Sequence, residues 1–293
     1  MNLFFEKLLS TPIAPRPSDW VTIAYLAITG VLIVIFRKNL ARWYVYACVH
    51  AVVILGVLSL NFIPNSLPLL FQVLRDWYPI ATIPTFYWEV APLTQIIFQS
   101  DFDDKIVQWE DRLFKGQPSL YLSKHFPSMV LSEFLHLCYF SYYWIIFSLA
   151  AMLYLQGKYQ EFHEVVFAVV LTFNICQIWH ILMPVKGPRY GFEKIKGNLA
   201  VGFFHNLTHA VLSRASSKGT AFPSSHAAIA VIVLLCAARY APISFIILCP
   251  FCIGLVVGTV YGRFHYAIDA IAGTALAFIT FEIAPIVYRW LLS

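Results

Sequence analysis

Long apolar runs, separated by short polar segments, restrict what this chain can fold into more than any other feature. Of its 293 residues, 60% are hydrophobic and only 12% are charged, whereas about a quarter of the residues in a soluble domain carry charge. Such a chain has too little polar surface to fold in water. Because a membrane forces every backbone N–H and C=O group to find an internal partner, we expect an all-α, polytopic membrane helix bundle.

The apolar runs predict about six to seven transmembrane helices, since a crossing needs about 20 apolar residues. The candidate crossings are 21–36, 43–63, 129–156, 165–184, 225–240, 242–261 and 266–288. Segment 64–128 is rich in proline, tryptophan and acidic residues, which predicts interfacial helices and loops. Its part 79–99 is an alternative crossing, against which two internal prolines and a glutamate argue. We expect one integral membrane domain, 1–293, in which 1–128 forms N-terminal spans and the interfacial segment, and 129–293 forms a catalytic bundle.

Two histidine motifs flank a pair of these runs. The first, 221–226, has the sequence AFPSSH, and the second, 261–269, has the sequence YGRFHYAID. A chain that crosses the membrane and returns between them brings His226 and His265 to the same face. Two imidazoles on one face are suited to phosphoryl transfer, because one can attack phosphorus while the other donates a proton.

The residues beside these histidines have the properties that such chemistry requires. His265 and Asp269 are four apart, so on a helix they share a face, and the carboxylate orients the imidazole for attack. The alternative is a polar pair that bridges helices. Ser224 and Ser225 precede an apolar run, as at a helix N-terminus whose N–H groups and hydroxyls bind phosphate. We therefore predict that His265, His226 and Asp269 are catalytic and that both serines bind phosphate.

Three cations complete the predicted phosphate site. Lys186 and Arg189 lie on either side of a Gly-Pro turn after the 165–184 run, and Arg263 precedes His265 by two residues. Fixed cations of this kind neutralise phosphoryl oxygens as charge develops on them. A residue two positions before another on a helix points about 200° away from it. We therefore expect Arg189, rather than Arg263, to reach the phosphate.

Taken together, these blocks resemble the type 2 phosphatidic acid phosphatase superfamily, whose usual signatures are K-x6-R-P, P-S-G-H and S-R-x5-H-x3-D. His265 and Asp269 match the last signature. Ser225 replaces the glycine of the middle one, and Gly258 and Thr259 stand where the last has serine and arginine. The form R-x-H-Y-x-x-x-D looks more like the branch that contains sphingomyelin synthases and inositol-phosphorylceramide synthases.

The resemblance implies an enzyme, a lipid phosphatase or phosphotransferase that forms a phosphohistidine intermediate, with water or a lipid hydroxyl as the acceptor. Two alternatives remain: a phospholipid headgroup transferase as the sole activity, and a non-enzymatic membrane transporter. The expected partners are a phosphorylated lipid substrate and membrane lipids. The net charge of +5 is modest, so no nucleic-acid partner is expected.

The basic residues predict the orientation of the chain. Three cations lie within 37–42, a density expected on the cytoplasmic side. With seven crossings, both histidine motifs and the loop 185–224 then lie on the extracytoplasmic (periplasmic, external or lumenal) face. That loop carries six basic residues against one glutamate, an excess that we interpret as anion binding.

No metal or other cofactor is expected, and the chemistry is predicted to be metal-independent. His205 and His209 are four apart, but the sequence shows no third ligand for them, and an interfacial amphipathic helix over 198–213 is the preferred interpretation. The pair Glu133-x-x-His136 has the spacing of di-metal helix bundles but occurs once, whereas such sites need two copies. Fixed cations and backbone dipoles can stabilise the developing charge instead.

Overall fold

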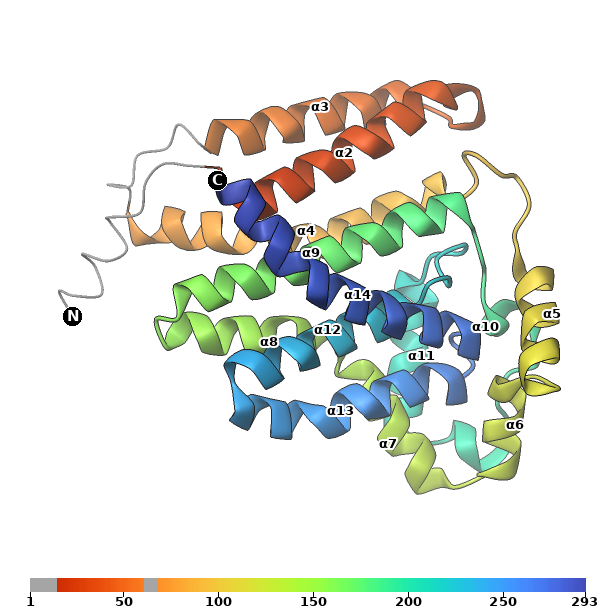
Figure 1. Cartoon of the computed structure of the whole chain (residues 1–293). Coiled ribbons are helices and arrows are strands. Elements are labelled where there is room, and N and C mark those ends of the chain that lie inside the picture. The colour runs from red at the N-terminus through yellow and green to blue at the C-terminus, as the bar shows by residue number, and fades with distance from the viewer. Residues whose placement is uncertain (1–14, 61–67) are drawn as a thin grey trace.

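Helices packed side by side make up the computed structural model, which describes residues 15–60 and 68–293 (Figure 1). In chain order they are α2 (Pro17–Ile35), η1 (Arg37–Asn39), α3 (Trp43–Ser59), α4 (Leu69–Leu93), α5 (Asp103–Phe114), α6 (Pro118–His125), α7 (Met129–Phe140), α8 (Tyr142–Leu155), α9 (Tyr159–Leu182), α10 (Pro188–Gly191), η3 (Gly197–Ala200), α11 (Phe203–Ala215), α12 (Ser225–Tyr240), α13 (Pro242–Tyr261) and α14 (Ala267–Leu292). Within the described residues, the one pairing of β type is a bridge between Val185 and Thr220. The predicted all-α class is confirmed.

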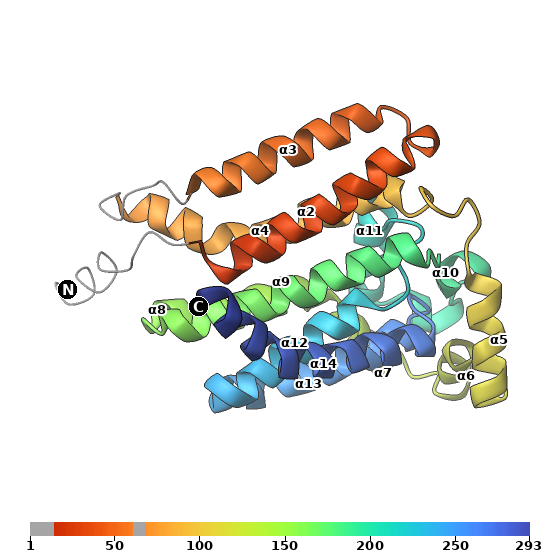
Figure 2. The same ribbon diagram turned by 45° about the horizontal axis from the view of Figure 1, so that its top comes forward.

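Helix α9 lies at the centre of the bundle and contacts α2, α4, α8, α12 and α14. Of its most apolar 18 residues 72% are buried, against 28% for α14, which lies towards the outside. Phe162, Val166 and Phe173 of α9 belong to one core that the surrounding helices share. In both views, α2 and α3 form a hairpin along one side of this bundle (Figure 2).

Fewer helices have spanning length than the sequence predicts. Among the described residues, four helices are long and apolar enough to cross a membrane, namely α2, α9, α13 and α14, and α7 with α8 makes a fifth if this pair crosses once. The predicted run 129–156 is bent by 51° at the break between these two helices. Helices α3 and α12 are apolar but have only 17 and 16 residues, and the end of the predicted 43–63 crossing lies outside the described residues. The long apolar helices make this chain an integral membrane protein.

The segment 64–128 contains a longer helix than its prolines predict. Beyond its first residues, which are not described, α4 continues for 25 residues through Pro79, Pro84 and Pro92. The neighbouring α9 and α2 pack against it, and tertiary packing of this kind can outweigh the local cost of a proline in a helix. Although α4 has spanning length, it is not among the described helices that are apolar enough to cross a membrane. The interfacial assignment of 79–99 stays a prediction.

Helices α5 and α6 cover one end of the bundle, far from the C-terminus (Figures 1 and 2). The carboxylate of Asp103 accepts hydrogen bonds from Lys186 N at 2.7 Å and Gly187 N at 2.9 Å. Glu110 accepts from Ile268 N at 3.2 Å, at the start of α14, and burial raises the pKa of Glu110 to about 7. The acidic residues of α5 therefore hold both the segment after α9 and the start of α14.

Helices α12 and α14 approach each other closely where the two histidine motifs meet. Ala227, Ala228 and Ala230 of α12 are fully buried, and such small side chains let helix backbones come together in a membrane protein. Gly273 of α14 faces the start of α12, so that a Cβ atom built on it would overlap the carbonyl oxygen of Ser224 and lie 3.3 Å from Ala228 N. Any side chain at 273 therefore pushes these two helices apart.

Gly273→Ala should consequently destabilise the protein, although alanine is the better helix former. We expect a loss of about 1–3 kcal/mol, the usual cost of overpacking, measured as a lower midpoint of thermal unfolding in detergent. Gly56→Ala in α3 is the matched control, because nothing lies within 4 Å of its added Cβ; it should leave stability unchanged or raise it by up to about 1 kcal/mol. Equal midpoints for the two variants would show that α12 and α14 are not closely packed at 273.

Candidate functional site

Helix α12 begins at the first histidine motif. Ser224 is its N-cap, and the side-chain oxygen accepts a hydrogen bond from Ala227 N at 3.2 Å, which satisfies one of the N–H groups that a helix start leaves free. His180 of α9 contacts the carbonyl oxygen of Pro223 through Nε2 at 3.1 Å. The helix start predicted from the two serines is confirmed, and His226 lies in the first turn of α12.

His265 lies in the turn between α13 and α14, at the junction that the runs 242–261 and 266–288 predict. The helix face that its spacing from Asp269 suggested is not formed, because only Asp269 is helical. The carbonyl of Thr259 closes this turn by accepting from Phe264 N at 2.9 Å and His265 N at 3.0 Å. Asp269 lies in the first turn of α14, and its carboxylate reaches back to the turn. Its Oδ2 accepts from Tyr266 N at 2.9 Å and lies 3.6 Å from His265 Nδ1. The carboxylate is thus beside the imidazole, although by a different local geometry from the one predicted.

Hydrogen bonding assigns the tautomer of His265. Its Nδ1 lies 3.0 Å from the carbonyl oxygen of Ala221, and because a carbonyl oxygen can only accept, Nδ1 carries the proton. Nε2 of the neutral ring is then unprotonated and can act as a nucleophile. Burial lowers the pKa of His265 to about 4, so the ring is neutral at pH 7.

His226 faces His265 across a small pocket. The two ring centroids are 5.5 Å apart, and His226 Nε2 lies 3.3 Å from the hydroxyl of Tyr139 in α7. The ring of Tyr139 stacks on that of His226, and Tyr142 packs against it as well. Both histidines line a pocket of about 40 Å³, which is room for a few water-sized groups at roughly 10–15 Å³ each.

Lys186 and Arg189 line the same pocket but differ in their partners. The ammonium group of Lys186 forms an ion pair with Asp101, which raises the pKa of Lys186 and lowers that of Asp101. The guanidinium of Arg189 donates from Nη1 to Ser216 Oγ at 3.2 Å and lies over the ring of Tyr190. Among the described residues, no carboxylate forms an ion pair with Arg189, so its charge is available to an anion in the pocket.

Three further residues that the sequence assigns to phosphate binding do not line this pocket. Arg263 has a left-handed backbone, with φ of 57°, and its guanidinium donates to the carbonyl of Glu193 and to Ser123 Oγ. Ser224 is fully buried and caps α12, and Ser225 is buried beside it. The structure therefore brings His226, His265, Lys186 and Arg189 together, with Asp269 behind His265, and places Arg263 elsewhere.

The sequence analysis missed several residues that shape the pocket. Tyr87 of α4 and Leu212 of α11 line it, and Asp101 and Asp103 hold Lys186 from the α5 end. The acidic run at 101–104 was the available signal for the two aspartates, because charged residues are rare in this chain. Tyr87 and Leu212 carry no such signal, since aromatic and aliphatic residues are abundant throughout.

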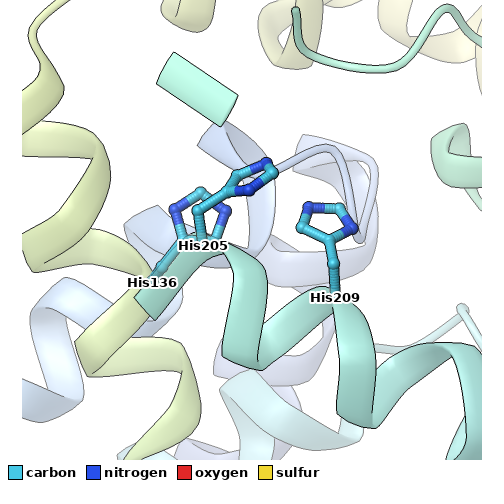
Figure 3. Close-up of side chains that lie close together, drawn as sticks. All are labelled: His136, His205 and His209. Carbon is cyan, nitrogen blue, oxygen red and sulfur yellow. The ribbon is translucent and has the colours of Figure 1, made fainter. Parts of the chain in front are cut away.

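A second cluster of titratable side chains lies beside the pocket. His136 of α7 meets His205 and His209 of α11, with all three ligand-forming nitrogen atoms within 4.8 Å of one another (Figure 3). The sequence shows no third ligand for the α11 pair, so this finding corrects the analysis of the histidines. Phe264 separates this cluster from His226, because its ring contacts His136, His209 and Tyr139.

Comparison with known proteins identifies a family for the greater part of this chain. Residues 104–283, which include both histidine motifs, α5 and the cluster on α7 and α11, match the sequence profile of the PAP2 superfamily. No curated protein sequence and no solved structure matches the chain significantly. The match covers more than half of the chain, and the chain therefore belongs to the PAP2 superfamily, whose members are generally phosphatases that act on phosphoesters.

Proposed function

We propose that this protein is a membrane-embedded lipid phosphatase or phosphotransferase that cleaves a lipid phosphoester through a phosphohistidine intermediate at His265. The observation that carries the proposal is the pairing of two imidazoles, 5.5 Å apart between ring centroids, across a pocket that also contains Arg189. One nucleophile, one proton donor and one unpaired cation are the groups that phosphoryl transfer requires.

In the first step, Nε2 of His265 attacks phosphorus, and the bond between phosphorus and the leaving oxygen breaks. His226, in its protonated form, gives a proton to that oxygen, and the negative charge of the bound phosphate favours this form. The attack leaves His265 positively charged, and its Nδ1–H faces the carbonyl of Ala221 and the carboxylate of Asp269. These two acceptors stabilise the charged ring and hold it in place.

In the second step, water or a lipid hydroxyl attacks the phosphohistidine. His226 is now neutral and takes the proton of the attacking group, the bond between phosphorus and Nε2 breaks, and His265 returns to its initial state. Arg189 neutralises the phosphoryl oxygens in both steps, and Lys186, with its partner Asp101, lies at the pocket wall. No step passes through a metal ion, and this chemistry is proposed to be metal-independent.

A lipid substrate is supported by an apolar groove between α13 and α14. The groove has a volume of about 430 Å³, and its lining includes Val260 and Ala267, which flank the turn that carries His265. An acyl chain in this groove would bring its phosphate to that turn.

The predicted orientation is not supported by the structure, because the 37–42 segment lies at the same end of the bundle as the candidate site: Leu40 packs with Ile181 near the end of α9, and the neighbouring His180 contacts Pro223 of the first histidine motif (Figure 1). The cations at 37–42 and the His265 turn therefore do not lie on opposite faces, as the sequence analysis expects, and the extracytoplasmic location of the site stays a prediction.

The product of the reaction tests this proposal. Purified protein incubated in vesicles of mixed phospholipids, with and without a ceramide-type lipid alcohol, should release phosphate or form a new headgroup lipid. His265→Ala should do neither, since loss of a nucleophile costs many orders of magnitude. His125→Ala, a change on the exposed face of α6, is the control that should keep full activity. A new headgroup lipid without free phosphate would favour a headgroup transferase, as the R-x-H-Y-x-x-x-D form suggests, and no product of either kind would contradict the proposal.

Asp269→Asn should keep the fold but slow the reaction by roughly 10⁴-fold, the loss measured when a catalytic histidine loses its orienting carboxylate. The amide oxygen can still accept from Tyr266 N, whereas the charge that stabilises the His265 imidazolium is gone. Asp104→Asn, an exposed change in the first turn of α5, is the matched control and should leave the rate unchanged. Phosphate release or headgroup transfer at the wild-type rate in Asp269→Asn would show that Asp269 is structural.

Arg189→Ala should lower activity by roughly a hundredfold or more, the usual loss on removing one group that stabilises transition-state charge. Arg189→Lys should recover little, because an ammonium group cannot replace the two-pronged guanidinium. Arg263→Ala is the matched control, since the Arg263 guanidinium binds Glu193 and Ser123 outside the pocket, and it should cost much less. The account of the pocket is wrong if steady-state rates fall further in Arg263→Ala than in Arg189→Ala.

A further inference from the structure

We propose that His136, His205 and His209 bind a divalent transition metal ion, with chemistry best suited to Zn²⁺, which joins α7 to α11. Three neutral imidazoles are an established ligand set for this ion. The chain brings them together from two helices that are distant in the sequence (Figure 3). The proposal is independent of the phosphoryl transfer chemistry, because none of the three histidines takes part in it.

The three rings lack the partners that buried histidines normally have. His136 and His205 are only 1% and 7% exposed. The Nε2 atoms of all three histidines are buried and have no hydrogen-bond partner within the described residues. Buried polar atoms are almost always hydrogen-bonded in proteins, so three unpaired nitrogen atoms at one place require an explanation. A metal ion at their centre supplies one.

The second nitrogen of two of these rings is bound in the way that metal-ligating histidines require. Nδ1 of His136 lies 2.7 Å from the carbonyl oxygen of Ser132, and because that oxygen can only accept, Nδ1 carries the proton and Nε2 has the free lone pair. Nδ1 of His205 faces Asn206 Oδ1 at 3.4 Å. Metal-binding histidines typically donate their other ring N–H to such an oxygen.

The backbone around the cluster is fixed before any metal binds. Glu133, one turn before His136 on α7, accepts from Phe204 N at 2.9 Å and His205 N at 3.0 Å and so caps the N-terminus of α11. His205 and His209 are four residues apart on that helix and therefore share one face. Gly202 is needed for this contact, because a Cβ atom there would overlap the Glu133 carboxylate.

The spacing of the nitrogen atoms is close to that of an occupied site. Zn–N bonds of about 2.0–2.1 Å in a tetrahedral arrangement place the ligand nitrogens about 3.4 Å apart, and here they lie within 4.8 Å of one another. Small rotations of the rings would close the difference. His209 is half-buried, so water can reach the fourth position. A fixed α11 would hold the pocket wall, because Leu212 and Ser216 follow the histidines along the chain and line the pocket with His226.

Metal content of the full-length protein in detergent tests this inference. After removal of metal with a chelator, addition of Zn²⁺ and desalting, the wild type should retain one Zn²⁺ per chain by elemental analysis, and Zn²⁺ should raise its unfolding midpoint. His209→Ala should bind Zn²⁺ at least tenfold more weakly and show no such rise. His125→Ala, in which an exposed histidine on α6 is removed, is the matched control and should behave as the wild type.

The wild type alone gives a second measurement that does not depend on how the variants fold. Co²⁺ added to the metal-free protein should produce the strong visible absorption of a tetrahedral site, and Zn²⁺ should abolish it. If His209→Ala and His136→Ala both unfold, this spectrum decides the question. The inference is overturned if the wild type shows no tetrahedral Co²⁺ spectrum, retains no Zn²⁺, or retains no more than a folded His209→Ala variant.

Discussion

Hydrogen bonds to Asp269 connect the two histidine motifs, and the rest of the candidate site depends on this connection. Its backbone oxygen accepts from Ser224 N at 2.9 Å, which ties the start of α12 to the start of α14. Its carboxylate accepts from Tyr266 N and lies beside His265 Nδ1. One buried residue therefore satisfies N–H groups at two helix starts and sets the position of the His265 ring. Because buried N–H groups require partners, the same hydrogen bonds that stabilise the bundle also bring the imidazoles together.

Other elements of the bundle supply the cations and the wall of the pocket around Asp269. Asp103, the first residue of α5, holds the segment that bears Lys186 and Arg189, and Asp101, just before this helix, forms an ion pair with Lys186. Helix α11, held on α7 by Glu133, supplies Leu212 to the pocket wall. Because Lys186 is paired with Asp101, Arg189 is the cation of this pocket that is free to bind phosphate. The superfamily signature has arginine where this chain has Thr259, and in our proposal Arg189 neutralises the phosphoryl group in its place. The proposed metal would act on the α7–α11 contact, and so on the shape of the pocket rather than on the reaction.

Features that depend on local sequence could be predicted, and those that depend on tertiary contacts could not. The start of α12 followed from its serines, and the all-α class followed from the apolar runs. The junction that carries His265 followed from the runs 242–261 and 266–288, but its local geometry did not, because the carbonyl of Thr259 closes a turn that a four-residue spacing does not reveal. His136 is 69 positions before His205, so the third member of the histidine cluster becomes visible only when α7 packs on α11. The break between α7 and α8 could not be predicted either, because the apolar run that contains it has no proline or glycine.

A structure of the protein with bound orthovanadate would test the central claim most directly, because vanadate adopts the five-coordinate geometry of phosphorus during transfer. We predict that vanadium binds His265 Nε2, that His226 contacts the oxygen opposite this bond, and that the Arg189 guanidinium binds the remaining oxygens while Arg263 stays with Glu193. Vanadate bound to His226 or at the cluster of His136, His205 and His209, or a pocket entered by Arg263 in place of Arg189, would contradict the account.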